Sequence, residues 1–224
     1  MRPGSQLEGA VRLLPVGAMV IAFGIAWGVA AKDAGLSDGL TYALSGIVFA
    51  GASQFASLEL WVGQMDYLAL FLITFAVNAR HILMGTTFYL DIKDQSPLRQ
   101  LFSVLVMTDA PYAMMQTEPD RARRIALIIG GGWLIWLTWM IGTAIGVVFG
   151  SVLGDTTVFG FDALMPIFFS VMIVSVFKGR ASILPFVGAA MASMLWYWSF
   201  PGNWHVIVGA LVGGFLNVIQ GESK

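Results

Sequence analysis

The sequence predicts an all-α protein, a polytopic helical membrane protein with about seven transmembrane helices plus a short re-entrant or discontinuous segment. Hydrophobic residues make up 58% of the 224 residues and charged residues 11%, against about 25% charged in a typical soluble domain. The mean hydropathy is +0.80. Apolar runs alternate with short polar turns, and little sequence is left for a soluble domain. Residues 1–224 are therefore expected to form a single integral membrane domain.

Seven apolar runs are predicted as spans, at residues 13–31, 40–62, 67–90, 125–150, 159–177, 182–200 and 205–220. The second run carries Ala50-Gly51-Ala52-Ser53-Gln54-Phe55 near its middle. Small residues followed by a glutamine at membrane depth indicate a kinked or locally unwound helix, whose freed backbone groups need partners. They equally fit a tight packing patch in which Gln54 bonds to a neighbouring helix.

A shorter apolar run, residues 101–115, is interrupted by Thr108-Asp109-Ala110-Pro111. At about 1.5 Å per residue it is too short to cross a hydrocarbon core of about 30 Å. A half-helix or re-entrant element is the preferred interpretation, and a surface amphipathic helix is the alternative.

Basic loops predict the orientation. Arginine and lysine in short loops accumulate on the cytoplasmic side, and residues 121–124, residues 178–180 and Lys224 alternate with loops that carry none. This places the C-terminus in the cytoplasm. With seven spans, the N-terminus is then expected outside.

Gly142, Gly146 and Gly150 are spaced by four residues and form one glycine face of the run at 125–150. Association of helices in a membrane depends on close packing of such small faces. The sequence therefore predicts a close helix contact here, within the chain or with a partner subunit.

The run at 67–90 carries Arg80 and His81 at its centre. An arginine at the middle of a membrane helix costs about 2.5–3.5 kcal/mol on insertion scales, and such charges usually face a bundle interior or an aqueous cavity. On one continuous helix, Asn78 and His81 would share a polar stripe, with Arg80 beside it. The pattern favours the wall of a transport pathway over simple hydrogen bonding between helices.

Arg80 stays charged at any cellular pH and needs a partner in the membrane. The candidates are Asp109, Asp162 or the carboxylate of a transported solute. Buried carboxyls can also titrate near working pH, so both aspartates are candidates for proton coupling as well as counter-ions. The expected binding site is completed by residues that can offer polar or backbone groups: Gly51, Ser53, Gln54, Asn78 and His81.

Other functions are disfavoured. The net charge of -1 argues against a nucleic-acid binder. With no cysteine and two histidines, neither a metal site nor a cofactor is expected. No hydrolase or metalloprotease motif is present, so the protein is not expected to be an enzyme.

Several motifs in their order resemble the AzlC-type large subunit of branched-chain amino-acid exporters: residues 50–55, Asn78-x-Arg80-His81, Thr108-Asp109 and Asp162-x-x-x-Pro166-x-Phe168. The resemblance implies a multi-pass transport domain in the bacterial cytoplasmic (inner) membrane that works with a small AzlD-type subunit. It implies proton-coupled export of leucine, isoleucine and valine, with methionine as a further candidate. A passive channel for a small neutral or anionic solute is the alternative.

Overall fold

The computed structural model describes residues 4–61, 66–153, 179–200 and 204–222, together with Ser170, Val174 and Phe177. It divides into two compact units, unit 1 (residues 1–54 and 78–162) and unit 2 (residues 55–77 and 163–224). Its helices are α1 (Gln6–Asp33), α2 (Asp38–Ala43), the π-helix η1 (Leu44–Val48), α3 (Gly51–Ser57), the 3₁₀-helix η2 (Leu58–Trp61), α4 (Tyr67–Asn78), α5 (Arg80–Ile92), α6 (Pro97–Leu105), α7 (Asp109–Gln116), α8 (Arg121–Ala126), the π-helix η3 (Leu127–Gly131), α9 (Gly132–Leu153), α11 (Arg180–Ser199) and α12 (His205–Glu222).

The described helices confirm the all-α class, but they support fewer spans than the sequence predicts. Helical stretches long and apolar enough to cross a bilayer are Gln6–Asp33, Tyr67–Ile92, Arg121–Gly150 and Arg180–Ser199. The run at 40–62, expected as a kinked or locally unwound span, forms four short helices in its described part and no single helix of span length. The apolar part of α12, Ile207–Gln220, is shorter than the four. The span expected at 159–177 lies almost entirely outside the described residues.

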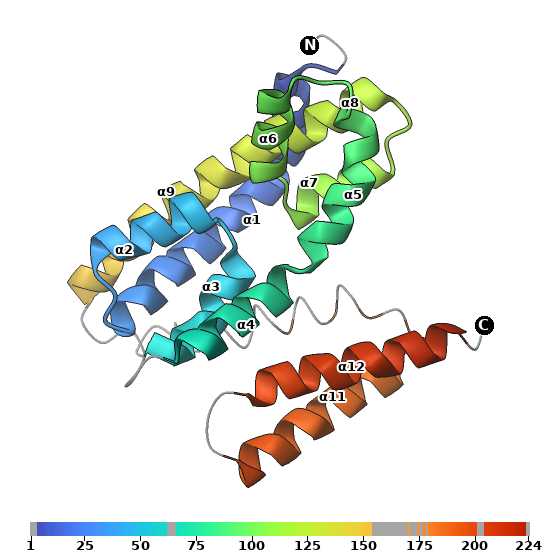
Figure 1. Ribbon diagram of the computed structural model, residues 1–224. Coiled ribbons are helices and arrows are strands. Elements are labelled where there is room, and N and C mark those ends of the chain that lie inside the picture. The colour runs from blue at the N-terminus through green and yellow to red at the C-terminus, as the bar shows by residue number, and fades with distance from the viewer. Residues whose placement is uncertain are drawn as a thin grey trace. The chain divides into compact units, whose positions relative to one another are not determined.

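The main packing contact of unit 1 joins α1 and α9, which lie side by side in Figure 1. A Cβ atom added to Gly24 would lie 3.0 Å from the Cα of Gly142, and one added to Gly28 would lie 2.8 Å from the carbonyl carbon of Gly146. Any side chain would force the backbones apart, since real Cβ atoms almost never approach below 3.0 Å. The predicted glycine face is confirmed, and its partner is α1 of the same chain.

The two helices run in the same direction. Gly9 of α1 lies against Ala126 of α8, whereas Gly28 lies against Gly146, further along both helices. The first turn of α1 is therefore at the same end of unit 1 as residues 121–124. The expectation of an N-terminus outside together with these arginines inside is wrong, because a parallel pair places both on one side.

Between α5 and α8 the chain forms a hairpin of two short helices, α6 and α7, that starts and finishes at this same end. Arg121 Nη2 of α8 is 2.8 Å from Asp94 Oδ2, just before α6. Glu118, just after α7, is 2.6 Å from Arg12 of α1. The bend of the hairpin lies deeper, where a Cβ on Gly132 would be 2.9 Å from the Cβ of Val106. The segment around Asp109 therefore consists of two short helices that meet at residues 106–108, and its partial entry into the membrane stays a prediction.

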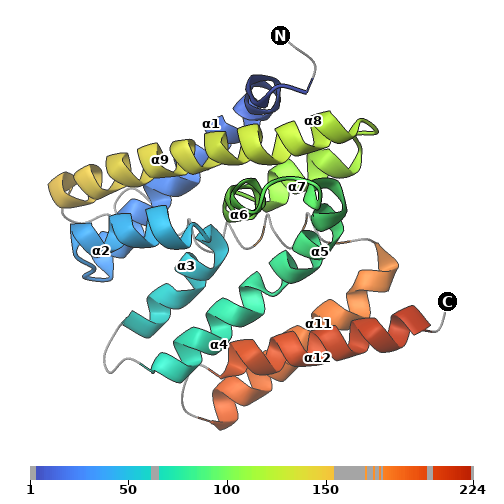
Figure 2. The same ribbon diagram turned by 45° about the horizontal axis from the view of Figure 1, so that its top comes forward.

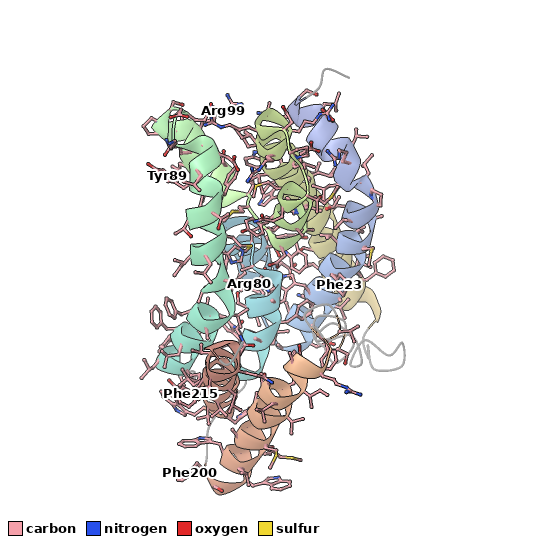
Figure 3. The ribbon with its side chains drawn as sticks, turned by 90° about the vertical axis from the view of Figure 1, so that its right-hand side faces the viewer. Phe23, Arg80, Tyr89, Arg99, Phe200 and Phe215 are labelled. Carbon is pink, nitrogen blue, oxygen red and sulfur yellow. The ribbon has the colours of Figure 1, made fainter. Side chains whose placement is uncertain are left out.

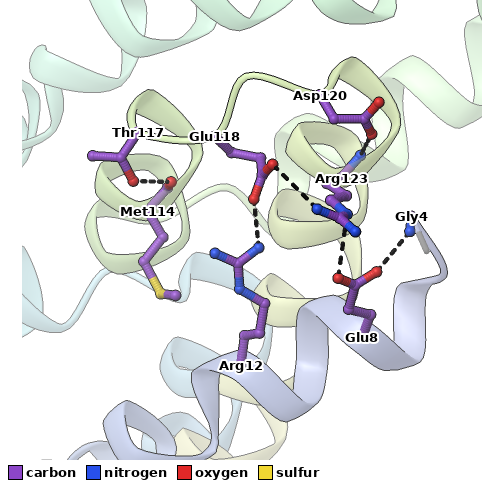
Figure 4. A network of polar contacts seen from close by, with 8 residues as sticks. All are labelled: Gly4, Glu8, Arg12, Met114, Thr117, Glu118, Asp120 and Arg123. Atoms are coloured by element: carbon purple, nitrogen blue, oxygen red, sulfur yellow. Dashed lines mark hydrogen bonds and ion pairs between the residues drawn. The ribbon is translucent and has the colours of Figure 1, made fainter. Parts of the chain in front are cut away.

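An ion-pair network fastens the end of this hairpin to α1 and α8 (Figure 4). Glu118 is 9% exposed, and its Oε2 accepts a hydrogen bond from Arg12 Nη1 at 2.6 Å. Arg123 lies 3.5 Å from Glu8 and 3.9 Å from the other oxygen of Glu118. Asp120 caps α8 by accepting from the backbone N–H of Arg123 at 2.9 Å. Two acidic and two basic side chains thus alternate where the chain leaves the hairpin.

In unit 2, α11 and α12 form an antiparallel pair, visible in Figure 2. A Cβ on Gly213 would lie 3.0 Å from the Cβ of Ala189, and Gly209 faces Ser193. Ser193 Oγ donates to the carbonyl of His205 at 2.6 Å. Small residues again allow two apolar helices to approach closely.

We expect Gly146→Leu to destabilise the protein by at least about 1–3 kcal/mol, the cost of overpacking a filled contact. The new side chain would meet the carbonyl oxygen of Ile25 and the Cα of Gly28, which are backbone atoms and cannot move alone. The measurement is the melting temperature and yield of purified protein. Gly214→Leu is the control, because nothing lies within 4 Å of a Cβ there. Equal losses in both variants would contradict the assignment.

Single cysteines should report the parallel arrangement, because the chain has no native cysteine. We expect Leu7→Cys and Thr117→Cys to react with an impermeant thiol reagent from one side of the membrane. Gly39→Cys should react from the other side, because it follows the far end of α1, about 40 Å along a 28-residue helix. Labelling of Leu7→Cys and Thr117→Cys from opposite sides would contradict the parallel pair.

Acid should weaken the network at Glu118. The hydrogen bond from Arg12 is the main cause that holds the pKa of Glu118 below its ordinary value of 4.5. A carboxyl with a lowered folded-state pKa stabilises the protein above the unfolded pKa, and that stability is lost as the pH falls through the folded pKa. We therefore expect Glu118→Gln to melt below wild type at pH 7 and the difference to shrink below about pH 4.5. Arg12→Gln should behave alike, and a difference that is independent of pH would contradict this role.

Candidate functional site

The helix that carries Arg80 is interrupted. The sequence pattern implied one continuous helix, but α4 ends at Asn78 and α5 begins at Arg80, with Ala79 between them. His81 Nδ1 lies 3.2 Å from the carbonyl oxygen of Asn78, which the interruption leaves accessible to a side chain. The polar stripe expected along a regular helix is therefore not continuous. Figure 3 shows Arg80 on the side of α5 that faces the rest of unit 1, and Tyr89 on the other side.

A second interruption lies at Phe49 and Ala50, between η1 and α3. Phe49 adopts a left-handed backbone conformation, with φ at 46°, which is unusual for a bulky residue. Nearby side chains satisfy the exposed backbone of Ala50. Its N–H donates to Gln54 Oε1 at 3.3 Å, and its carbonyl accepts from Ser53 Oγ at 2.9 Å. The predicted unwinding is thus confirmed, immediately before Gly51.

The alternative interpretation of this stretch, as a packing patch, also holds in part. A Cβ on Gly51 would lie 2.9 Å from the ring of Trp139 on α9. Ser53 and Gln54 are 2% and 3% exposed. The glycine therefore allows the interrupted segment to lie flat against α9.

A hydrogen bond joins the two interruptions. Asn78 Nδ2 donates to Ser53 Oγ at 3.0 Å, and Ser53 in turn holds Ala50. The last residue of α4 is thereby connected to the start of α3. Of the predicted site residues, Ser53, Gln54, Asn78 and His81 form one linked group.

Arg80 has an internal carboxylate partner, as predicted. Its Nη2 is 2.9 Å from Asp109 Oδ2, and the side chains are 35% and 56% exposed. Asp109 is the first residue of α7, where the helix dipole favours a negative charge. The pair therefore connects the α4–α5 interruption to the bend of the α6–α7 hairpin. Asp162, the other candidate partner, lies outside the described residues.

Thr108 was not among the predicted site residues, although it stands at the N-cap of α7. Its hydroxyl makes no capping bond and is buried without a hydrogen-bond partner, and the same is true of Arg80 Nε. A threonine directly before the first residue of a short helix is a recognisable capping signal, which could have pointed to it. Two unused polar atoms therefore adjoin the ion pair.

The charged and polar groups of this arrangement are few and of different kinds. Within the part of the chain that the structure describes, no three histidine, aspartate or glutamate side chains come together as a metal site would require. What the site offers is one permanent cation, one carboxylate and several amide and hydroxyl groups at interrupted helices, as carriers use.

Comparison with known proteins places the chain in a family. Residues 15–153 match the family described as AzlC protein, a range that includes every predicted site residue except Asp162. The branched-chain amino acid transport protein AzlC of Bacillus subtilis (strain 168) is 27% identical over 98% of this chain and 89% of its own length. An uncharacterized membrane protein of Archaeoglobus fulgidus is 28% identical over 96% of this chain and 95% of its own.

The inner membrane protein YgaZ of Escherichia coli (strain K12) is 28% identical over 66% of this chain and 63% of its own length. No solved structure matches the chain. The family match covers more than half of the sequence. It begins at Pro15 within α1 and continues to Leu153, the last residue of α9. The resemblance inferred from the motifs is confirmed: the chain is a multi-pass membrane protein that belongs to the AzlC family.

Proposed function

We propose that this protein is a secondary transporter that exports branched-chain amino acids, namely leucine, isoleucine and valine, with methionine as a further candidate substrate. The observation that carries the proposal is the Arg80–Asp109 ion pair, which is 2.9 Å long, with side chains 35% and 56% exposed, at the junction of interrupted helices. The similarity to a branched-chain amino acid transport protein supports the substrate class.

The pair supplies a simple transport cycle. Without substrate, Asp109 neutralises Arg80. When substrate binds, its carboxylate takes over the guanidinium, because the planar group can hold a carboxylate through two parallel hydrogen bonds. Arg80 stays paired in both states, whereas the hairpin that carries Asp109 is released from it. The exchange of partners thereby couples binding to movement of the hairpin.

Apolar side chains adjoin the pair. Met84 lies one helical turn after Arg80 and Met107 lies two residues before Asp109, and both belong to a buried cluster. Methionine side chains adapt to irregular shapes, so they can accommodate different aliphatic groups. Each buried methylene contributes only about 0.8 kcal/mol, and we expect leucine, isoleucine and valine to be poorly discriminated.

A partner subunit and an ion gradient complete the proposal. We infer that the chain works as the large subunit of a two-component permease with a small AzlD-type membrane protein, in the bacterial cytoplasmic membrane. For the coupling proton the candidates are Asp109 and Asp162.

We expect Arg80→Lys to lose most leucine efflux, because lysine keeps the charge but cannot form the two-point contact with a carboxylate. The measurement is efflux of labelled leucine from loaded cells that co-express the small subunit, with and without a protonophore. The amount of variant protein in the membrane fraction should equal that of wild type.

Arg99→Lys is the matched control, since Arg99 is exposed on α6 and lies far from Arg80 in Figure 3. Undiminished efflux by Arg80→Lys would falsify the direct contact with substrate. Wild-type efflux that follows the leucine gradient alone and ignores the protonophore would instead indicate a passive channel.

A further inference from the structure

We propose that the Arg80–Asp109 pair is a recognition site for zwitterions, in which Arg80 binds the carboxylate of the substrate and Asp109 binds its ammonium group. This inference rests on the proposed function and specifies the chemistry of the same site. It assigns Asp109 a direct contact with substrate, in addition to its part as the counter-ion of Arg80.

The argument starts from charge balance. The two side chains neutralise each other across 2.9 Å. If a monoanion such as a 2-oxo acid displaced Asp109 from Arg80, the aspartate would be left without its counter-ion, and unpaired charges inside a membrane protein are costly. A primary amine bound to Asp109 would leave Arg80 unpaired in the same way. A zwitterion inserted between them leaves both side chains with an opposite charge.

The unused hydrogen-bonding groups fit this substrate. An ammonium group has three donors. Asp109 provides carboxylate oxygens, and the neighbouring Thr108 provides a buried hydroxyl without a hydrogen-bond partner. On the other side, Arg80 Nε is buried without a partner while Nη2 is engaged. The guanidinium can therefore present Nε and an Nη together to a carboxylate, the usual two-point geometry.

The neighbouring groups hold Arg80 in place without competing for it. Asn78, two residues before it, is anchored to Ser53, and His81 lies against the backbone carbonyl of Asn78. Both side chains therefore use these contacts to fix the interruption at Ala79. The partial exposure of Arg80 and Asp109, 35% and 56%, leaves each side chain accessible to a small molecule.

Three ligands with the same branched side chain separate the two contacts. Leucine carries both charged groups, 4-methyl-2-oxopentanoate lacks the ammonium group, and 3-methylbutylamine lacks the carboxylate. The measurement is transport of labelled leucine by proteoliposomes that contain both subunits. Each unlabelled compound is added as an inhibitor on the side from which leucine enters the carrier. For wild type we expect inhibition constants of both analogues at least about tenfold above that of leucine, because each loses hydrogen bonds to a charged group.

Asp109→Asn is the decisive variant. It should bind leucine more weakly and lower the preference for leucine over the 2-oxo acid at least about tenfold, because no carboxylate then requires an ammonium group. Asp94→Asn is a closely matched control. Asp94 pairs with Arg121 Nη2 at 2.8 Å and is 61% exposed, similar to Asp109, but lies at the other end of α5. This control should keep the wild-type preference.

The outcomes separate the two proposals. If the wild-type complex carries no leucine, the proposed function fails. If it carries leucine but the 2-oxo acid competes equally, or if Asp109→Asn keeps the preference, the zwitterion site is wrong and the transport function stands. Should Asp109→Asn be too unstable to purify, Thr108→Val tests the same contact. It should weaken leucine binding while leaving the 2-oxo acid unaffected, and equal effects on both would overturn the proposal.

Discussion

The described structure of unit 1 depends on the close approach of α1 and α9. Their backbones touch at Gly24 with Gly142 and at Gly28 with Gly146, where no side chain would fit. Membrane helices gain little from the hydrophobic effect between them, so van der Waals contact over such a surface provides much of the association. The pair then serves as a rigid support for the interrupted segments, since Gly51 lies on Trp139 and Val106 lies against Gly132.

Interrupted helices expose backbone groups that a bilayer cannot satisfy. The chain meets this requirement with its own polar side chains near the site. Ser53 and Gln54 bond to Ala50, and His81 lies against Asn78. The π-helices η1 and η3 show the same tolerance for irregular backbone, which often marks functional positions. Polar residues at the centre of the sequence's apolar runs therefore have a structural cause, apart from the function proposed for them.

The ion pair of the candidate site and the glycine contact of α9 could be predicted from the sequence, because each follows from the chemistry of particular residues. A permanent charge in an apolar run required a partner, and Asp109 was one of the carboxylates available to Arg80. Glycines four residues apart identified the contact face on α9. The interruption at Ala79 gave no such signal, because residues 77–81 contain neither glycine nor proline and the polar stripe fitted a regular helix.

The direction of α1 relative to α9 also escaped prediction. Basic residues report a side of the membrane only when the number of crossings between them is known. The run at 40–62 is long enough for a span but forms four short helices in its described part, so its length alone does not predict the number of crossings. Arg12 and Arg123, which meet the same glutamate, are far apart in sequence, and no local pattern links them.

The parallel contact has a consequence for how the protein is made. Its partners are distant in sequence: Arg12 and Glu118 are 106 residues apart, and Ser45 and Thr143, which share a buried hydrogen bond between η1 and α9, are 98 residues apart. At about 5–20 residues per second, a ribosome needs roughly 5 to 20 seconds to synthesise the intervening chain. During that interval the glycine face of α1 is in the membrane without its partner, open to lipid or to another newly made helix. Correct assembly thus depends on keeping that face unoccupied until the second half of unit 1 has been inserted.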